Sequence, residues 1–133
     1  MIKQISHLGL AVKDLEKAMD FYRSVLQLEP AAPIIGGNER DLKVSLVKVG
    51  DATLELIQPL TDTSVMAKFL EKRGEGIHHV CLEVDNINAE LEWLKSKGLE
   101  SIGTPKPGAE GMSVFLHPKG TNGILVELVQ KEE

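Results

Sequence analysis

The hydrophobic pattern of the chain predicts strands and helices in alternation. Residues 4–12 alternate between apolar and polar side chains, which is typical of a β-strand. Asp14 follows at the position of a helix N-cap, and apolar residues then recur at helical spacing, at Leu15, Ala18, Met19, Tyr22 and Leu26. Prolines and glycines between Pro30 and Gly37 end this helix. Two strands near 41–49 and 52–58 are predicted next, hinged at Gly50 and Asp51.

The second part of the chain repeats this order of elements. It predicts a strand at 77–84, a helix from about 86 to 97, and strands near 112–117 and 123–130. A short extra strand is expected around 29–33 and, in the second copy, around 100–102. An amphipathic stretch at 63–73 predicts a helix that links the halves. The expected fold class is α+β, a single domain over 1–133 with two tandem βαβββ modules at about 1–60 and 73–132.

An internal repeat supports this division. A shift of 72 residues places residues 7–12 on 79–84 and residues 54–58 on 126–130, with no gap between the two matches. Each half therefore carries a histidine near its start and a glutamate near its end, 48 residues apart. Two matches at one offset favour a duplicated module over coincidence.

The repeated residues are His7, Glu55, His79 and Glu127, and they predict a metal site. Both histidines alternate away from the helix-covered face of their strands, so a sheet built twice would curve into a half-barrel cleft lined by them. The glutamates lie in apolar strands, where an unpaired carboxylate is costly and a divalent cation offsets the cost. Mixed nitrogen and oxygen donors suit Co, Ni, Zn, Mn or Fe, whereas structural zinc sites usually contain cysteine.

Other chemically capable residues have simpler interpretations. A lone strand histidine is more often packed or at the surface than a ligand. His78 points to the core side of its strand, and His117, before Pro118, fits a turn. Cys81 is interpreted as a small cleft-lining residue. Gln58 and Gln130 match across the repeat but lie off the glutamate face.

Composition excludes several classes of protein. A formal charge of −5 and scattered lysines and arginines argue against a nucleic-acid surface. The single cysteine permits no internal disulfide, and no apolar run approaches membrane-spanning length. The residues after Met1 lead into a strand rather than a signal segment, so a cytoplasmic protein is expected.

Three stretches carry a family resemblance: HLGLAVKDLEKAMDFY at 7–22, LELIQPLTDTSVMAKFLEKRGEGIHHVCLEVDNI at 54–87 and FLHPKGTNGILVELVQ at 115–130. With the duplicated His/Glu module, they resemble the vicinal oxygen chelate (glyoxalase-like) superfamily and, within it, the methylmalonyl-CoA epimerase family. The resemblance implies the same four ligands, a divalent ion with Co²⁺ first among the metals above, an acyl-CoA substrate and a homodimer. It implies epimerisation at carbon 2 through proton removal and return.

The resemblance also implies two acid/base groups on opposite faces of the substrate. Glu127 is one, and the other falls near Lys43, with Glu39 and Asp41 as neighbours. Two alternatives remain open at this point. One is another metal enzyme on the same scaffold, such as a lactoylglutathione lyase-type isomerase or a dioxygenase. The other is a metal-free binding protein, which would be expected to lack the four ligands.

Overall fold

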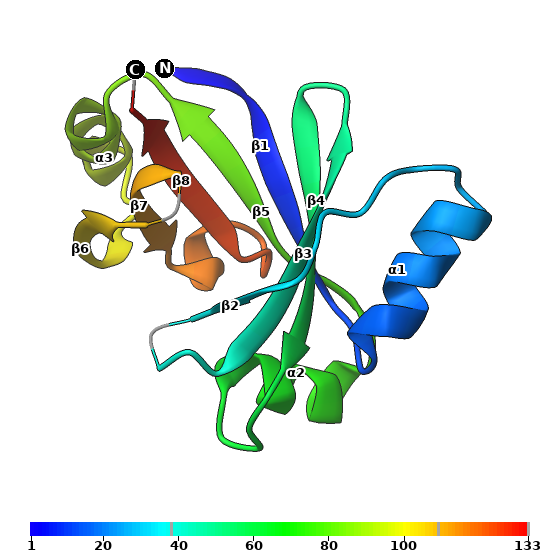
Figure 1. The fold of residues 1–133 in the computed structure, drawn as a ribbon. Helices are drawn as coiled ribbons and strands as arrows, with labels where there is room; N and C mark the ends of the chain where they lie inside the picture. The colour runs from blue at the N-terminus through cyan, green and yellow to red at the C-terminus, as the bar shows by residue number, and fades with distance from the viewer. Residues whose placement is uncertain (38, 109, 133) are drawn as a thin grey trace. The chain divides into compact units, whose positions relative to one another are not determined.

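The elements of the chain fall into two units that carry the same βαβββ order (Figure 1). The computed structural model describes residues 1–37, 39–108 and 110–132. The N-terminal unit comprises His7–His78, and the C-terminal unit comprises Met1–Ser6 together with His79–Glu133. The predicted fold class, α+β with a duplicated βαβββ module, is confirmed.

The N-terminal unit is built from a mixed sheet and two helices. Its elements are the second half of β1 (Ile2–Ala11), then α1 (Leu15–Ser24), β2 (Ile34–Gly36), β3 (Leu42–Val49), β4 (Ala52–Pro59) and α2 (Val65–Arg73). β1 runs parallel to β4, while β4 pairs antiparallel with β3 and β3 antiparallel with β2. Helix α2 lies where the sequence predicts a linking helix.

The C-terminal unit repeats this arrangement. Its elements are the first half of β1, most of β5 (Gly76–Val84), α3 (Ile87–Ser96), β6 (Ser101–Pro107), β7 (Gly111–Leu116), the 3-10 turn η1 (Pro118–Gly120) and β8 (Val126–Lys131). β5 is parallel to β8, and β8, β7 and β6 follow in antiparallel pairs. No helix among the described residues is long and apolar enough to cross a membrane.

The sheet of the N-terminal unit buries apolar side chains on both faces. On one face, Leu15 and Met19 of α1 pack against Val47 and Leu56. The other face forms a second cluster with α2, made of Ala11, Val44, Ile57 and Met66. Side chains alternate along a strand, so His7 and Glu55 belong to this second face.

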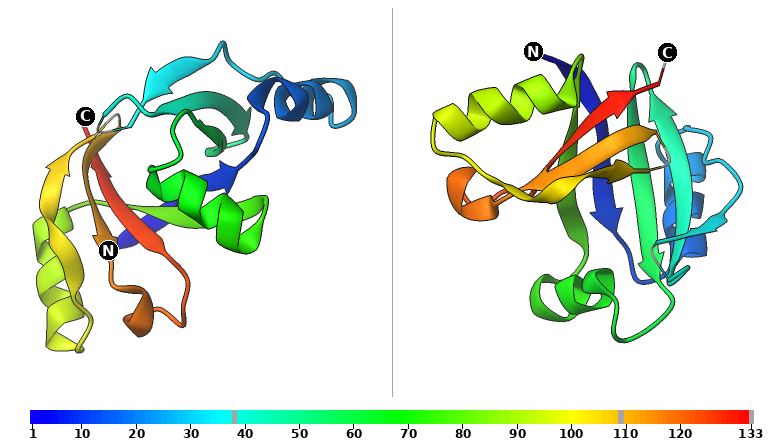
Figure 2. Two further views of the ribbon diagram at one scale, coloured as in Figure 1. Left: turned by 90° about the horizontal axis from the view of Figure 1, so that it is seen from below. Right: turned by 90° about the vertical axis from the view of Figure 1, so that its left-hand side faces the viewer.

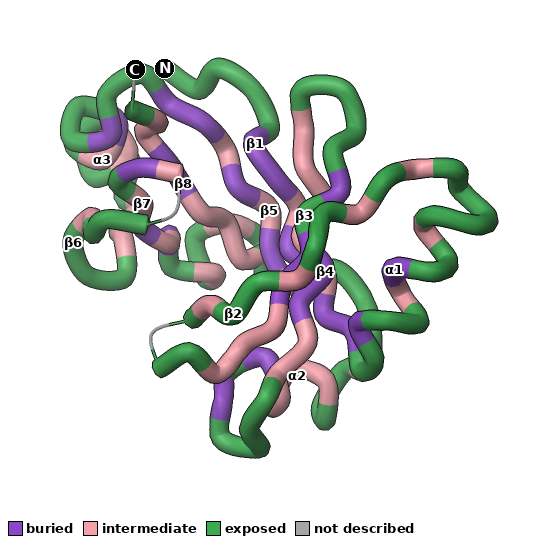
Figure 3. Tube along the Cα trace, in the orientation of Figure 1, coloured by how far each residue is buried: buried purple, intermediate pink, exposed green. Residues whose placement is uncertain are grey.

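The C-terminal unit has one helix against its sheet. Ile87 of α3 packs on Val84, Val114 and Leu128, and both views of Figure 2 show α3 lying along these strands. Figure 3 shows the buried stretches concentrated in the strands, while the outer sides of α1 and α3 are exposed. Val84 and Leu82 face the helix, as predicted, which leaves His79, Cys81 and Glu83 on the other face.

The boundaries of three elements differ from the sequence-based expectation. The strand expected at 29–33 lies at Ile34–Gly36, because Pro30 and Pro33 have no N–H to donate to a ladder. Helix α1 stops at Ser24, and Gln27 takes a positive φ of 61° that no helix continues through. Strand β6 extends to Pro107, with a register shift between Ile102 and Lys106.

Candidate metal centre

His7 and Glu55 form the candidate ligand pair of the N-terminal unit. The parallel register of β1 and β4 places Glu55 opposite Gly9, two residues beyond His7 and on the same face. The His7 Nε2 lies 3.4 Å from the Glu55 Oε2. His7 is 5% exposed, so its imidazole is buried, whereas the Glu55 carboxylate keeps a partly open side. The small Gly9 between them leaves room for the two side chains to meet.

His79 and Glu127 form the equivalent pair of the C-terminal unit. Glu127 lies opposite Cys81 in the parallel register of β5 and β8, and its Oε1 is 3.5 Å from the His79 Nε2. The Phe115 ring stands edge-on to the His79 ring, with 5.6 Å between ring centroids. This aromatic contact holds the buried imidazole in one orientation.

The geometry of both pairs fits coordination of a divalent ion. Two donors bound to one ion at about 2.1 Å and a right angle stand about 3 Å apart. The observed separations of 3.4 and 3.5 Å lie a few tenths of an ångström above that value. In each pair the imidazole nitrogen and the carboxylate oxygen face each other, so both could coordinate the same ion. The 72-residue shift carries one pair onto the other with the same strand register.

Comparison with known proteins places the chain in a family. Residues 6–115 match the model of the glyoxalase/bleomycin resistance protein/dioxygenase superfamily. The mitochondrial methylmalonyl-CoA epimerase of Homo sapiens is 44% identical to the chain, over 96% of this chain and 73% of that protein. An ethylmalonyl-CoA/methylmalonyl-CoA epimerase of Cereibacter sphaeroides is 43% identical, over 98% of this chain and 99% of that protein. The chain belongs to the methylmalonyl-CoA epimerase family of this superfamily.

A solved structure agrees with this assignment. A methylmalonyl-CoA epimerase in complex with methylmalonyl-CoA and NH4⁺ superposes on the chain with a TM-score of 0.88 at 29% identity. The alignment covers 98% of this chain and 96% of that one. The fold of this member of the epimerase family therefore matches that of a structure solved with an acyl-CoA.

Lys43, the sequence-based choice for the second acid/base group, is not brought together with His7 and Glu55. In the antiparallel register of β3 and β4, Lys43 lies opposite Gln58, whereas Leu46 lies opposite Glu55. Residues 43 and 46 differ by an odd number, so their side chains leave opposite faces of the sheet. The Lys43 Nζ reaches toward α1, 3.9 Å from the Glu16 Oε1. This placement argues against a catalytic role for Lys43 in this family member.

The remaining histidines and the cysteine have structural positions. His78 stacks edge-on against Phe69 of α2, with 4.9 Å between centroids, and burial lowers the pKa of its imidazole. His117 caps η1, and its Nδ1 accepts a hydrogen bond from the Lys119 N–H at 3.4 Å. Cys81 is fully buried beside Glu127. The positions of His78 and His117 agree with the interpretations made from the sequence.

Glu83 lies on the same face of β5 as His79 and is held by polar neighbours within the C-terminal unit. The Gln4 Nε2 donates to its Oε1 at 3.1 Å, and the ammonium groups of Lys131 and Lys3 lie 3.3 and 3.6 Å from the carboxylate. The Gln4 hydrogen bond, together with these lysines, lowers the pKa of Glu83 despite its burial. Lys131 also lies 3.7 Å from Glu110, whose Oε2 accepts a hydrogen bond from the Ser6 hydroxyl at 3.0 Å. Glu83 is therefore a fixed, charged part of the scaffold rather than a group free to exchange protons at neutral pH.

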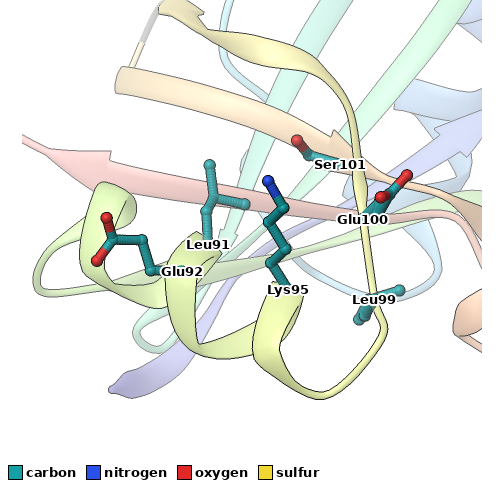
Figure 4. A pocket seen from close by; sticks show the side chains of 6 residues that line it. All are labelled: Leu91, Glu92, Lys95, Leu99, Glu100 and Ser101. Carbon is teal, nitrogen blue, oxygen red and sulfur yellow. The ribbon is translucent and has the colours of Figure 1, made fainter.

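The C-terminal unit has a surface hollow that is lined by residues other than His79 and Glu127. It has a volume of about 240 Å³, and α3 together with the start of β6 lines it. Figure 4 shows the Lys95 side chain rising from α3 between Glu92 and Glu100, with Leu91 next to Glu92 and Leu99 below Glu100. The lining contains none of the candidate metal ligands, so the hollow is not part of the candidate metal centre.

Proposed function

We propose that this protein interconverts the (2R) and (2S) forms of methylmalonyl-CoA by removing and returning the proton on carbon 2. One observation carries the proposal. Two His–Glu pairs stand at repeat-equivalent positions, with the same register and nearly the same separation, in a chain 43–44% identical to proteins named for this reaction.

We propose that His7, Glu55, His79 and Glu127 bind one divalent ion together. Either pair alone supplies two donors, which is fewer than the ligands a catalytic site usually takes from the protein. Four donors with two imidazoles and two carboxylates satisfy that need and leave room for substrate oxygens on a metal that accepts six ligands. Co²⁺ is the first choice, and Ni²⁺, Zn²⁺, Mn²⁺ and Fe²⁺ also suit this donor set.

The chemistry of carbon 2 explains why such a site is needed. The proton lies between a thioester and a carboxylate, and its removal leaves negative charge that spreads onto the thioester oxygen. When bound, the ion supplies a Lewis acid that stabilises that charge and a template that orients the two oxygens. The protein's own groups must then take a proton from one face of carbon 2 and return one to the other.

Glu127 is the proposed base on one face. Its Oε1 lies 3.5 Å from the His79 Nε2, so the carboxylate stands beside the proposed ion and next to the carbon that loses the proton in this proposal. The side chain is 15% exposed, so it is shielded from bulk water yet reachable. Such partial shielding favours proton transfer to the substrate over exchange with solvent.

We propose that the group on the other face is a residue other than Lys43, and the position of the Lys43 side chain on the α1 side of the sheet supports this. Glu39 and Asp41 precede β3 and are the carboxylates that we propose next. Asp41 is half-buried, and its backbone oxygen accepts a hydrogen bond from the Leu60 N–H at 2.7 Å, which anchors this segment to the end of β4. Single substitutions of Glu39 and Asp41 to alanine would identify the group by slower interconversion together with loss of carbon-2 proton exchange for one enantiomer only.

A homodimer in the cytoplasm completes the proposal. The dimer is supported by the superfamily resemblance, in which modules commonly pair across an interface. Light scattering of the purified protein tests it: a mass near twice the 14.6 kDa of one chain supports a dimer, and a mass near 14.6 kDa contradicts it.

The test of the reaction is deuterium wash-in. The protein, loaded with Co²⁺, is incubated in D₂O with (2R)- or (2S)-methylmalonyl-CoA, and carbon 2 is followed by NMR. Deuterium uptake with interconversion of the enantiomers supports the proposal. Turnover of a glutathione hemithioacetal without any uptake at carbon 2 would instead indicate a lactoylglutathione lyase-type enzyme.

A further inference from the structure

Two glutamines occupy equivalent places in the two units and join each helix start to the strand that bears the glutamate. The Gln58 Oε1 accepts a hydrogen bond from the Leu15 N–H at 2.7 Å, and the Gln130 Oε1 accepts one from the Ile87 N–H at 2.8 Å. The 72-residue shift maps one contact onto the other. Each glutamine lies three residues after a proposed ligand, Glu55 or Glu127, on the same strand.

These contacts are distinct from ordinary helix capping. The first N–H groups of a helix have no partner within the helix and need an outside acceptor. The side chain of each local N-cap residue accepts from the third N–H of its helix. Asp14 accepts from the Lys17 N–H at 3.1 Å, and Asn86 accepts from the Ala89 N–H at 3.0 Å. The glutamine side chains accept from the first N–H of each helix, and each glutamine lies on a strand 43 residues further along the sequence. Each helix start is thus held once by its own segment and once by the strand of the glutamate.

The glutamine contact continues the pairing that aligns the two ligands. In the N-terminal unit, His7 lies on β1, which leads directly into α1, and Glu55 lies on β4. The β1–β4 ladder runs to Ala11 opposite Ile57, and the Val12 N–H then donates to the Ile57 oxygen at 2.9 Å. The hydrogen bond from the Leu15 N–H to the Gln58 side chain is the next contact between these two segments. Since the helix is rigid, this link resists sliding of β4 along β1.

We propose that Gln58 and Gln130 are positioning residues that set the separation of the His7–Glu55 and His79–Glu127 pairs. The inference rests on the proposed metal site. The equal separations of 3.4 and 3.5 Å in the two pairs accompany equal glutamine contacts of 2.7 and 2.8 Å. A slip of one strand would move the carboxylate away from its imidazole, and metal affinity would fall.

The test compares three variants of the N-terminal unit. Gln58→Met keeps the length of the side chain and removes the acceptor, while Gln58→Glu keeps an acceptor at the same place. Asp14→Ala removes the local cap of the same helix and leaves the Gln58 contact intact. Metal affinity is measured by titrating the metal-free proteins with Co²⁺, the visible Co²⁺ absorption reports coordination geometry, and thermal melting reports stability.

The expected result separates positioning from simple stabilisation. Gln58→Met should bind Co²⁺ at least about fivefold more weakly and change the absorption spectrum, since loss of groups that orient metal ligands typically costs 10–100-fold. Gln58→Glu should bind within about twofold of the unsubstituted protein, because a carboxylate at a helix start still accepts the N–H. Asp14→Ala should melt at a lower temperature, with affinity and spectrum unchanged.

Contrary outcomes are also distinct. Equal loss of affinity in Gln58→Met and Asp14→Ala, or no loss in Gln58→Met, overturns the inference while leaving the metal site standing. Failure of the unsubstituted protein to bind Co²⁺ overturns the proposed site itself. Should Gln58→Met not fold, Gln130→Met with Asn86→Ala as its control makes the same comparison in the C-terminal unit.

Discussion

Glu127 lies opposite Cys81 on the parallel strands β5 and β8, in the same register that places Glu55 opposite Gly9 on β1 and β4. In both units the residue opposite the glutamate is small, and the histidine stands two positions before it on the same face. This shared register turns a repeat in the sequence into two like His–Glu pairs, which are the proposed metal ligands.

His79→Ala tests the metal ligands. Loss of one of four donors should weaken binding of a divalent ion at least about tenfold. The measurement is a Co²⁺ titration of the metal-free protein, with His117→Ala as the control, since His117 is exposed and caps a turn. Unchanged affinity in His79→Ala would remove His79 from the site.

Glu127→Gln separates coordination from proton transfer. The amide oxygen can still bind the ion, but the amide cannot accept the proton from carbon 2. This variant should keep measurable Co²⁺ and lose at least about 10²-fold in the rate of interconversion, as general-base removal typically does. A rate within tenfold of the unsubstituted enzyme would show that another group takes the proton.

Lys43→Ala should leave interconversion of both enantiomers within about twofold of the unsubstituted rate. Lys43 leaves the sheet on the α1 side, where its ion pair with Glu16 is long and solvent-accessible, and such pairs contribute about 0–1 kcal/mol to stability. Steady-state assays starting from each enantiomer check this. Slower interconversion from both enantiomers, with exchange of the carbon-2 proton against solvent deuterium kept for one enantiomer only, would restore Lys43 as the second acid/base group.

Glu83→Gln should lower stability in a pH-dependent way. The native contacts with Gln4 and the two lysines lower the pKa of Glu83 below its ordinary value of 4.5. A lowered native pKa gives stability that is present above the unfolded pKa and lost as the pH falls through the native one. Urea unfolding at pH 7 should show a loss of about 1.5–3 kcal/mol, the size of a hydrogen bond to a charged group.

The same experiment at lower pH provides the check. As the pH falls below about 4.5 and further through the native pKa, the difference between Glu83→Gln and the unsubstituted protein should shrink. Glu71→Gln, at an exposed position of α2, is the control and should change stability little at any pH. A difference that stays constant with pH would mean that Glu83 acts through packing rather than charge.

The sequence predicts the order of elements and the two His–Glu pairs because both leave periodic signals. Strand alternation fixes the face of His7 and His79, and the 72-residue repeat links each to its glutamate. Element ends were less predictable, since the prolines near residue 30 displace β2 to Ile34–Gly36 through missing N–H groups.

Two features were beyond the sequence pattern. Placing Lys43 required the register between β3 and β4, and a change of one residue in that register exchanges the faces of the sheet. The equivalence of Gln58 and Gln130 was visible in the repeat, but the sequence did not indicate their partners, which are helix N–H groups 43 residues away. The folded structure brings these helix N–H groups to the ends of β4 and β8, and no sequence pattern reports that contact.

The most direct test of the central claim is a Co²⁺ titration of deuterium uptake at carbon 2 of methylmalonyl-CoA. The metal-free protein is mixed with increasing Co²⁺ in D₂O, and uptake is followed together with bound metal. If His7, Glu55, His79 and Glu127 bind one ion together, activity should rise in proportion to bound Co²⁺ and level off at one ion per chain. Uptake that is unchanged in the metal-free protein, or that levels off only at two ions per chain, would contradict the shared four-ligand site.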